Sequence, residues 1–198
     1  MIEKVREIFK REAAAIENIP VTASFATAVE LIYKQVHGKN GKLVTSGMGK
    51  AGQIAHNIAT TFSSTGTPSI FLHPSEAQHG DLGILQENDV LLAISNSGKT
   101  REIIELIDLK NNLYPRIPVI VITGNEDSPL AQKADCYLLT GAPGEVCLLG
   151  LTPTTSTTMM TVIGDALVVL MMGKIDFNLD DYAKRHHGGY LGMLSRGL

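Results

Sequence analysis

The sequence predicts one α/β domain in which a mostly parallel sheet of five strands is covered by helices on both faces, a three-layer, doubly wound arrangement. Three observations predict this fold class. Short apolar runs alternate with helical segments from residue 42 onward, as in chains built from βαβ units. Two loops rich in glycine and hydroxyl residues each follow such a run. The length of 198 residues suits one domain of this kind and is short for two.

Two helices are expected before the alternation begins. Apolar residues recur at helical spacing from Ile2 to Ile16 and stop before Pro20, and a second set covers residues 25–36 and stops at Gly38. The alternation then follows. Strands are expected at residues 42–45, 69–72, 90–94, 119–123 and 136–139, with helices at 50–64 and 100–113 and a short helix from Pro129.

The last third of the chain is expected to be helical. A hydroxyl-rich run at residues 152–158 leads into an apolar helix at 159–172, and Pro153 suits a helix start. A final helix at 179–185 ends at His186. No repeat or linker interrupts the chain, so residues 1–198 are interpreted as a single domain, with the helices before residue 38 packing on it or in an oligomer.

Composition excludes several classes of protein. A hydrophobic fraction of 44% with a formal net charge of −3 is ordinary for a soluble protein and argues against a nucleic-acid binder. The charged N-terminus is no signal peptide, and the longest apolar stretch, 166–172, is shorter than the ~20 residues that span a bilayer. Cys136 and Cys147 have neither metal-ligand nor redox spacing. A cytoplasmic protein that meets no membrane is expected.

The first glycine-rich loop, at residues 45–52, predicts an anion site. Loops of this kind present backbone N–H groups at the start of a helix, where the helix dipole favours negative charge. Gly47, Gly49 and Gly52 also match the dinucleotide fingerprint G-x-G-x-x-G. A dinucleotide site, however, needs an acidic residue at the end of the second strand, and that strand ends at Leu72 and His73. A phosphorylated ligand is therefore favoured.

The second loop, at residues 95–100, predicts a phosphate site as well. Its Gly98-Lys99-Thr100 imitates the end of a P-loop, but Ala93 stands where the first glycine of that motif belongs. The hydroxyl groups of Ser95, Ser97 and Thr100 are instead suited to a phosphate monoester. Either loop alone could be a tight turn with a helix cap. The two loops together with Lys50 favour phosphate binding.

The residues that carry a family resemblance are spread over 41–192. The chain resembles the sugar isomerase (SIS) domain, a flavodoxin-like fold, and within it the arabinose-5-phosphate isomerases of bacterial capsule and lipopolysaccharide synthesis. The matching blocks are residues 47–50, 61–68, 76–83, 94–98, 149–154 and 164–167. The resemblance implies interconversion of D-ribulose 5-phosphate and D-arabinose 5-phosphate through an enediol(ate), the entry step to the sugar acid Kdo.

The resemblance also assigns site residues. Lys50, Glu102, Glu145 and His186 are similar by position to the family's catalytic residues. His186 or Glu145 would move the proton between C1 and C2, Glu102 would orient a partner or open the sugar ring, and Lys50 would neutralise the oxyanion or lie near the phosphate. Substrate-binding residues are expected to be Ser46, Gly47, Gly49, Gly66, Thr67, His79, Ser95, Asn96, Ser97 and Thr100. Without the resemblance, a carboxylate or histidine at a helix end only complements the dipole.

No cofactor is expected to be required. The resemblance places His73 at the position of a histidine associated with zinc in some relatives. Together with His79 it could hold a metal, but no compact ligand cluster requires one, and bound zinc would be adventitious or inhibitory. The apolar N-terminal helices and the segment 159–172 favour a homo-oligomer. Related proteins form dimers and tetramers with sites at subunit interfaces, where His79 or His186 could enter a neighbour's pocket.

The chain departs from the family pattern at three places. Lys99 replaces an acidic residue, His187 replaces a proline, and no CBS module follows before Leu198. Two alternatives remain open: a sugar-phosphate sensor without catalysis, as SIS domains serve in some transcription regulators, and an isomerase of another phosphosugar. The enzyme is favoured by retention of Lys50, Glu102, Glu145 and His186, because a sensor needs only the phosphate loops.

Overall fold

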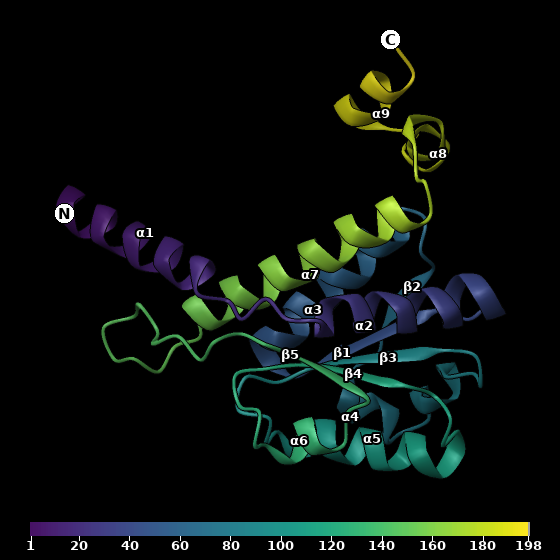
Figure 1. Cartoon of the computed structure of the whole chain (residues 1–198), viewed down its shortest axis with the longest axis horizontal. Coiled ribbons are helices and arrows are strands. Elements are labelled where there is room, and N and C mark those ends of the chain that lie inside the picture. Colours follow the sequence, from purple (N-terminus) through teal and green to yellow (C-terminus); the bar gives the residue numbers. More distant parts are fainter. Residues whose placement is uncertain (198) are drawn as a thin grey trace.

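The computed structural model describes residues 1–197 and shows a five-stranded sheet between two helical layers (Figure 1). All neighbouring strands are parallel, and their order in the sheet is β2-β1-β3-β4-β5. The strands are β1 (Leu43–Gly47), β2 (Ser69–Phe71), β3 (Val90–Ile94), β4 (Val119–Thr123) and β5 (Cys136–Leu139). The doubly wound fold predicted from the alternation is confirmed, and the sheet is parallel throughout.

Helices cover both faces because each central strand is apolar on both sides. One core lies under α2 (Ser24–Ile32), α3 (Gly49–Ser64) and α7 (Thr155–Lys174), and receives Leu43, Leu92 and Ile120 from the strands. The opposite core lies under α4 (Pro74–Ala77), α5 (Arg101–Leu113) and α6 (Pro129–Gln132), and receives Val44, Leu91 and Val121. Alternate residues of one strand therefore enter opposite cores, as the pleat requires.

Several short elements were not expected from the sequence. The polar connection after β2 forms α4 and the 3₁₀-helix η2 (Asp81–Ile84), and α2 continues into a π-helical segment, η1 (Tyr33–His37). A further helix, α9 (Gly189–Ser195), follows the expected α8 (Leu179–Arg185). In addition, α7 begins four residues earlier than the apolar pattern, because the hydroxyl groups of Thr157 and Thr158 bond back to the Thr154 carbonyl.

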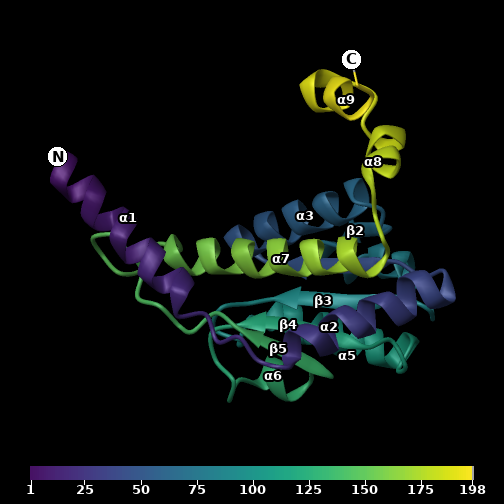
Figure 2. The ribbon, with the colours of Figure 1, turned by 45° about the horizontal axis from the view of Figure 1, so that its top comes forward.

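Helix α7 is long and apolar enough to cross a membrane by length and composition alone. The sequence predicted no membrane-spanning segment, because the longest uninterrupted apolar stretch has only residues 166–172. In the structure, Met159, Ile163 and Leu167 of α7 are fully buried in the core beside the sheet, and the helix lies against α3 (Figure 2). This is the packing of a core helix, so the composition of α7 is weak evidence for a membrane span.

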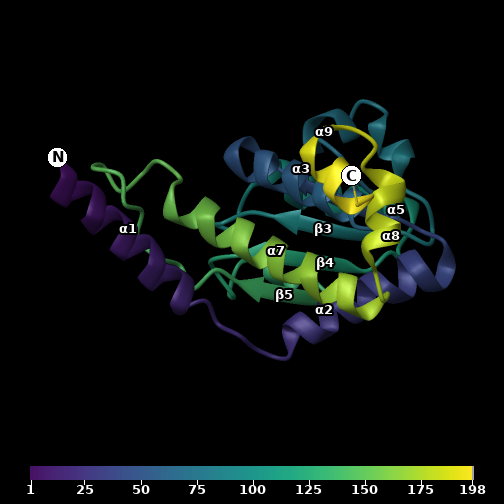
Figure 3. The ribbon, with the colours of Figure 1, turned by 90° about the horizontal axis from the view of Figure 1, so that it is seen from above.

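The two ends of the chain extend away from the sheet (Figure 1). In the view from above, α1 lies to the left of the sheet (Figure 3). Helix α1 (Ile2–Glu17) has no buried residue, and neither has α8. Both ends nevertheless carry large apolar side chains that are exposed in the single chain. They are Ile2, Val5, Phe9, Leu179, Tyr190, Leu191, Met193 and Leu194.

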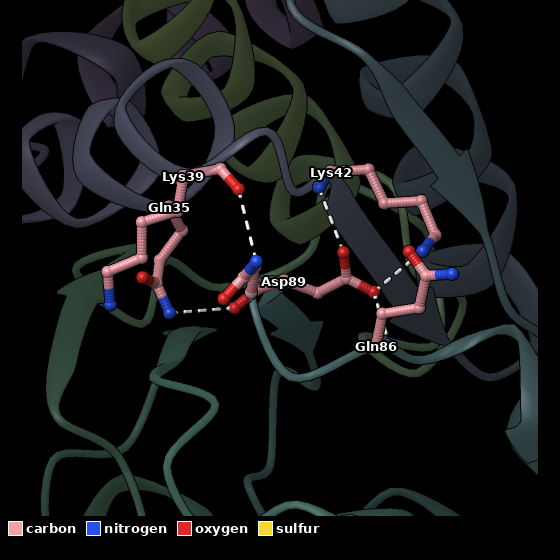
Figure 4. A network of polar contacts seen from close by, with 6 residues as sticks. Gln35, Lys39, Lys42, Gln86 and Asp89 are labelled. Atoms are coloured by element: carbon pink, nitrogen blue, oxygen red, sulfur yellow. Dashed lines mark hydrogen bonds and ion pairs between the residues drawn. The ribbon is translucent and has the colours of Figure 1, made fainter.

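A buried carboxylate fixes the start of the sheet. Figure 4 shows Asp89 accepting bonds from the backbone N–H groups of Lys42 (2.9 Å) and Gln86 (2.8 Å) and from Lys42 Nζ (2.7 Å). Its backbone carbonyl accepts a further bond from the Gln35 side chain. The Asp89 side chain is fully buried, and its partners on Lys42 precede β1. The network therefore holds the entry of β1 beside the entry of β3.

Replacing Asp89 by asparagine is expected to destabilise the fold by about 3 kcal/mol, because an amide nitrogen must then face N–H donors and the buried ion pair is broken. Urea denaturation of Asp89→Asn would measure the loss. The neighbouring Asn88→Ala, which removes one exposed bond to the Lys39 carbonyl, is the control and is expected to cost about 1 kcal/mol or less. Equal midpoints for the two variants would contradict this account of the network.

Candidate active site

A cavity of about 500 Å³ lies at the carboxyl edge of the sheet, the place where α/β sheets bind ligands. Three segments line it: the turn from β1 into α3, the loop from β3 into α5, and the long connection between β5 and α7. The sequence-predicted site residues that meet there are Lys50, Ser95, Asn96, Ser97, Thr100 and Glu145. Residues about 50 positions apart in the chain therefore share one cavity.

The β1–α3 turn presents Lys50 to the cavity. Gly49 has φ +59°, a left-handed conformation that glycine adopts without strain. A Cβ atom on Gly47 would lie 2.7 Å from the Ala51 carbonyl oxygen, so the strand end and the first helical turn approach closely. The Ser46 hydroxyl is fully buried and donates to the Leu72 carbonyl at 2.7 Å. Ser46 and Gly47 thus shape the turn, and Lys50 carries the exposed charge.

The β3–α5 loop offers hydroxyl and amide groups. Ser95 Oγ lies 2.7 Å from Thr100 Oγ1, so the hydroxyl of one supports the other across the loop. Ser97 Oγ accepts the Lys99 N–H at 3.2 Å. Within residues 1–197, the N–H groups of Ser97 and Thr100 have no hydrogen-bond acceptor. Free N–H groups and hydroxyls before a helix of 13 residues make a site suited to a phosphate.

Glu145 lies on the β5–α7 connection and is held by the start of α7. Its Oε2 accepts the Thr154 N–H at 2.7 Å, the Thr154 hydroxyl at 2.9 Å and the Ser156 N–H at 3.3 Å. Partial burial pushes the pKa of Glu145 upward, but the hydrogen bonds from Ser156 and Thr154 lower the pKa by more. The net pKa is below the usual glutamate value, so this side chain is an anion at neutral pH.

Thr154 and Ser156 were missed as functional residues by reasoning from the sequence. The hydroxyl-rich run at 152–158 was interpreted as a helix start, and residues 149–154 as a block of the family resemblance, with no role in the site assigned to either. Its role could have been suspected because a carboxylate beside a helix N-terminus is stabilised by the free N–H groups there. The cavity also receives Ser156 and Thr157 from α7 itself.

The structure does not bring Gly66 and Thr67 to the cavity. They precede β2, so they lie at the amino edge of the sheet, opposite the cavity. Thr67 is fully buried with its hydroxyl 3.1 Å from His37 Nε2, and a Cβ on Gly66 would meet the ring of Phe177. Neither residue lines the cavity of the single chain, and their assignment to substrate binding stays a prediction.

His73 and His79 lie on the carboxyl side of β2, outside the main cavity. His73 faces a neighbouring cavity that Gly47 and Gly49 also line, together with His56 and Phe71. The Nδ1 atom of His73 is buried without a hydrogen-bond partner in residues 1–197. His79 is exposed. Over the same residues no three His, Cys, Asp or Glu side chains cluster as metal ligands, so a zinc ion at His73 would need ligands from elsewhere.

Glu102 and His186 also lie outside the cavity of the single chain. Glu102 is half-buried in the first turn of α5, two residues after Thr100. His186 ends α8, beyond the C-terminus of α7, whose N-terminus borders the cavity. A helix of 20 residues is about 30 Å long, so His186 is remote from the cavity of its own chain. Figure 2 shows α8 beyond the C-terminal end of α7.

The ring of His186 is nevertheless held in one orientation. It stacks on Tyr182 with ring centroids 3.7 Å apart, and its Nδ1 lies 3.0 Å from the Tyr182 carbonyl oxygen. A carbonyl oxygen only accepts hydrogen bonds, so Nδ1 is the donor in this contact. In the neutral tautomer that makes it, the lone pair is on Nε2, which no contact within residues 1–197 uses.

Known proteins that are similar to this chain include SIS domains and sugar-phosphate isomerases. The SIS domain model matches residues 37–170. Arabinose 5-phosphate isomerase KdsD of Shigella flexneri is 45% identical over 183 residues, which cover 92% of this chain and 54% of that protein. KdsD of Pseudomonas aeruginosa is 46% identical over 168 residues, covering 85% and 50%. The chain thus spans about half the length of the curated relatives it matches.

Two solved structures are similar over nearly their whole length. A Bacteroides fragilis protein, described as a candidate phosphosugar isomerase involved in capsule formation, is 68% identical with a TM-score of 0.95, covering 96% of this chain and 99% of that one. An Escherichia coli CFT073 protein, solved in complex with arabinose 5-phosphate, is 34% identical with a TM-score of 0.86, covering 92% and 95%. The sheet, the site loops and these matches agree: the chain belongs to the SIS domain family.

Proposed function

We propose that this protein is an aldose–ketose isomerase that interconverts D-ribulose 5-phosphate and D-arabinose 5-phosphate. The observation that carries the proposal is that one cavity of about 500 Å³ unites the Ser95–Thr100 loop with Lys50 and Glu145. Its volume lies in the usual range for small-molecule sites, about 300–1,000 Å³. The names of the KdsD relatives and the sugar phosphate bound by the E. coli structure support the same substrate.

The phosphate of the sugar binds at the Ser95–Thr100 loop, where hydroxyl groups and free N–H groups converge. The carbonyl end then lies toward Lys50 and Glu145 on the other walls of the cavity. This orientation separates the phosphate from the carbonyl end of the sugar, where negative charge develops during the reaction. The ammonium group of Lys50 is placed to stabilise negative charge on the enediolate oxygen.

The chemistry conserves all atoms within the sugar. A base removes one proton from C1 of the ketose, the electrons move to the C2 oxygen, and a cis-enediolate forms. The O1 proton then moves to the C2 oxygen, and return of a proton to C2 gives the aldose. Glu145 is ionised and uses Oε2 for Thr154 and Ser156, so its Oε1 accepts the hydroxyl proton that moves between the two oxygens.

The carbon-bound proton is taken by His186 of a second copy of the chain. Support comes from the free Nε2 and from the distance between His186 and the cavity of its own chain. A dimer or tetramer would also cover the exposed apolar residues of α1, α8 and α9. Glu102 and His79 then lie at the rim of the cavity, and the partner subunit completes that rim. No cofactor is required, and zinc at His73 would be adventitious or inhibitory.

The proposed role is the supply of arabinose 5-phosphate in the cytoplasm for Kdo used in capsule or lipopolysaccharide. Proton NMR of ribulose 5-phosphate with the protein in deuterium oxide tests the activity. The expected result is arabinose 5-phosphate carrying deuterium at C2, formed equally fast with and without a chelator. Binding of the sugar without exchange would indicate a sensor, and exchange only with a hexulose 6-phosphate would indicate another isomerase. Either outcome would overturn the proposal.

A further inference from the structure

The peptide group that joins Glu145 to Val146 is bonded to α1 in two ways. Its carbonyl is bonded directly, and its N–H is bonded through the Thr155 hydroxyl. Arg11 of α1 donates from its guanidinium to the Glu145 carbonyl oxygen at 3.1 Å. The Val146 N–H donates to Thr155 Oγ1 at 3.1 Å, and that hydroxyl donates to Glu12 Oε1 at 2.8 Å. Two consecutive residues of α1 therefore fix the carbonyl and the N–H of one peptide group.

The geometry of a helix explains why neighbouring residues can do this. Consecutive side chains on a helix point about 100° apart and do not face each other. Arg11 and Glu12 can therefore reach two separate points, the loop and the first residue of α7. Thr155 is almost fully buried between them, so its hydroxyl has one acceptor and one donor in fixed positions.

Apart from these bonds and those that the Glu145 carboxylate accepts from Thr154 and Ser156, little holds the loop in place from outside. Its tip exposes Leu148, Leu149 and Leu151 to solvent, with relative exposures of 86%, 78% and 79%. Its internal bonds, such as the Thr152 N–H to Cys147 Sγ, shape the loop but do not tie it to another element. A segment with few buried contacts opens easily, so bonds from α1 restrict where the Glu145 carboxylate lies.

The position of the Glu12 carboxylate lowers the stability of the fold. Its Oε2 is buried and has no hydrogen-bond partner in residues 1–197. A buried acceptor without a partner lowers stability, whereas most other charged side chains of α1 are exposed. This arrangement is better explained by its effect on the loop than by the stability of α1.

We propose that Arg11 and Glu12 are positioning residues, which set the place of the Glu145 carboxylate by clamping its peptide group to α1 and α7. The clamp itself is independent of the reaction. Its effect on catalysis rests on the proposed isomerase function. Because a displacement of about 1 Å can cost about 100-fold in rate, releasing the clamp should lower kcat while the phosphate loop, and hence KM, is affected little.

The test compares Arg11→Ala and Glu12→Ala with a control on the same helix, Arg6→Ala, which removes only an exposed pair with Glu3. Both clamp variants are expected to lower kcat for ribulose 5-phosphate about 10- to 100-fold, with KM changed less than about threefold. Glu12→Gln retains an acceptor for the Thr155 hydroxyl, so it should keep kcat within about threefold of wild type. Arg6→Ala should match wild type.

Hydrogen exchange measured by mass spectrometry supplies a readout that needs no activity. Peptides covering residues 143–154 should exchange faster in both clamp variants than in wild type. Arg11→Ala releases the Glu145 carbonyl, and Glu12→Ala removes the acceptor that orients the Thr155 hydroxyl, to which the Val146 N–H donates. If these peptides exchange as in wild type, the clamp is overturned whether or not the protein is an isomerase. Faster exchange with unchanged kcat in an active enzyme would overturn the positioning role. Failure of wild type to isomerise the sugar would instead overturn the proposed function.

Discussion

Glu145→Gln is expected to lower kcat about 10²- to 10⁴-fold, the usual loss when a group that transfers a proton is removed. Glutamine keeps an oxygen that can accept from Thr154 and Ser156, so the loop should remain in place and KM should change little. Steady-state kinetics with ribulose 5-phosphate would measure both values. Glu87→Gln, at an exposed position, is the matched control, and a Glu145→Gln variant with activity close to that control would remove Glu145 from the mechanism.

Glu145→Gln is also expected to change how the unfolding free energy depends on pH. The pKa of Glu145 is lowered in the fold by its hydrogen bonds, which outweigh the effect of partial burial. A lowered pKa means that the ionised group stabilises the fold above the pKa of the unfolded chain, about 4.3 for glutamate, and that this contribution is lost as the pH falls through the folded pKa. The difference in unfolding free energy between wild type and Glu145→Gln should therefore shrink below about pH 4. A difference independent of pH would contradict the lowered pKa.

The strands were predictable from the sequence because parallel strands covered on both faces consist of uninterrupted apolar residues. Val90–Ile94 and Val119–Thr123 have no polar residue before their last position and are fully buried. The four-residue helix Pro74–Ala77 was not predictable, because one turn gives no period to detect. The start of α7 was missed because threonine and serine are weak helix formers, and here their hydroxyls bond to the turn itself.

Part of the site was also predictable. Lys50 and the residues of the Ser95–Thr100 loop follow the carboxyl ends of neighbouring strands, so the order of elements alone brings them together. The same reasoning places Gly66 and Thr67 away from this cavity, because residues that precede a strand lie at the other edge of a parallel sheet. The bonds from Thr154 and Ser156 to Glu145 depend on how the chain folds back on itself between residues 145 and 154. The local sequence pattern does not determine that path.

In the proposed arrangement His186 acts in the cavity of a second molecule, so neither the sequence nor one chain fixes its place. If His186 serves the cavity of a partner, then His186→Ala and Lys50→Ala should each lose most activity, because each removes one component of every site. Mixed oligomers of the two variants would behave differently. In randomly mixed dimers, about one quarter of the sites receive an intact Lys50 from one subunit and an intact His186 from the other.

Co-expression of the two variants with different affinity tags, followed by purification of the mixed oligomer, tests this arrangement. Activity of the purified mixed dimer should rise well above that of either variant alone, toward about half of wild type, because one of its two sites is intact. Co-expression of His186→Ala with Glu87→Gln, whose substitution lies outside the cavity, controls for dilution. A mixture no more active than the separate variants would mean that Lys50 and His186 act within one chain. Helices α8 and α9 would then have to fold back over a distance of about 30 Å, which would need a rearrangement of the C-terminal arm rather than a partner.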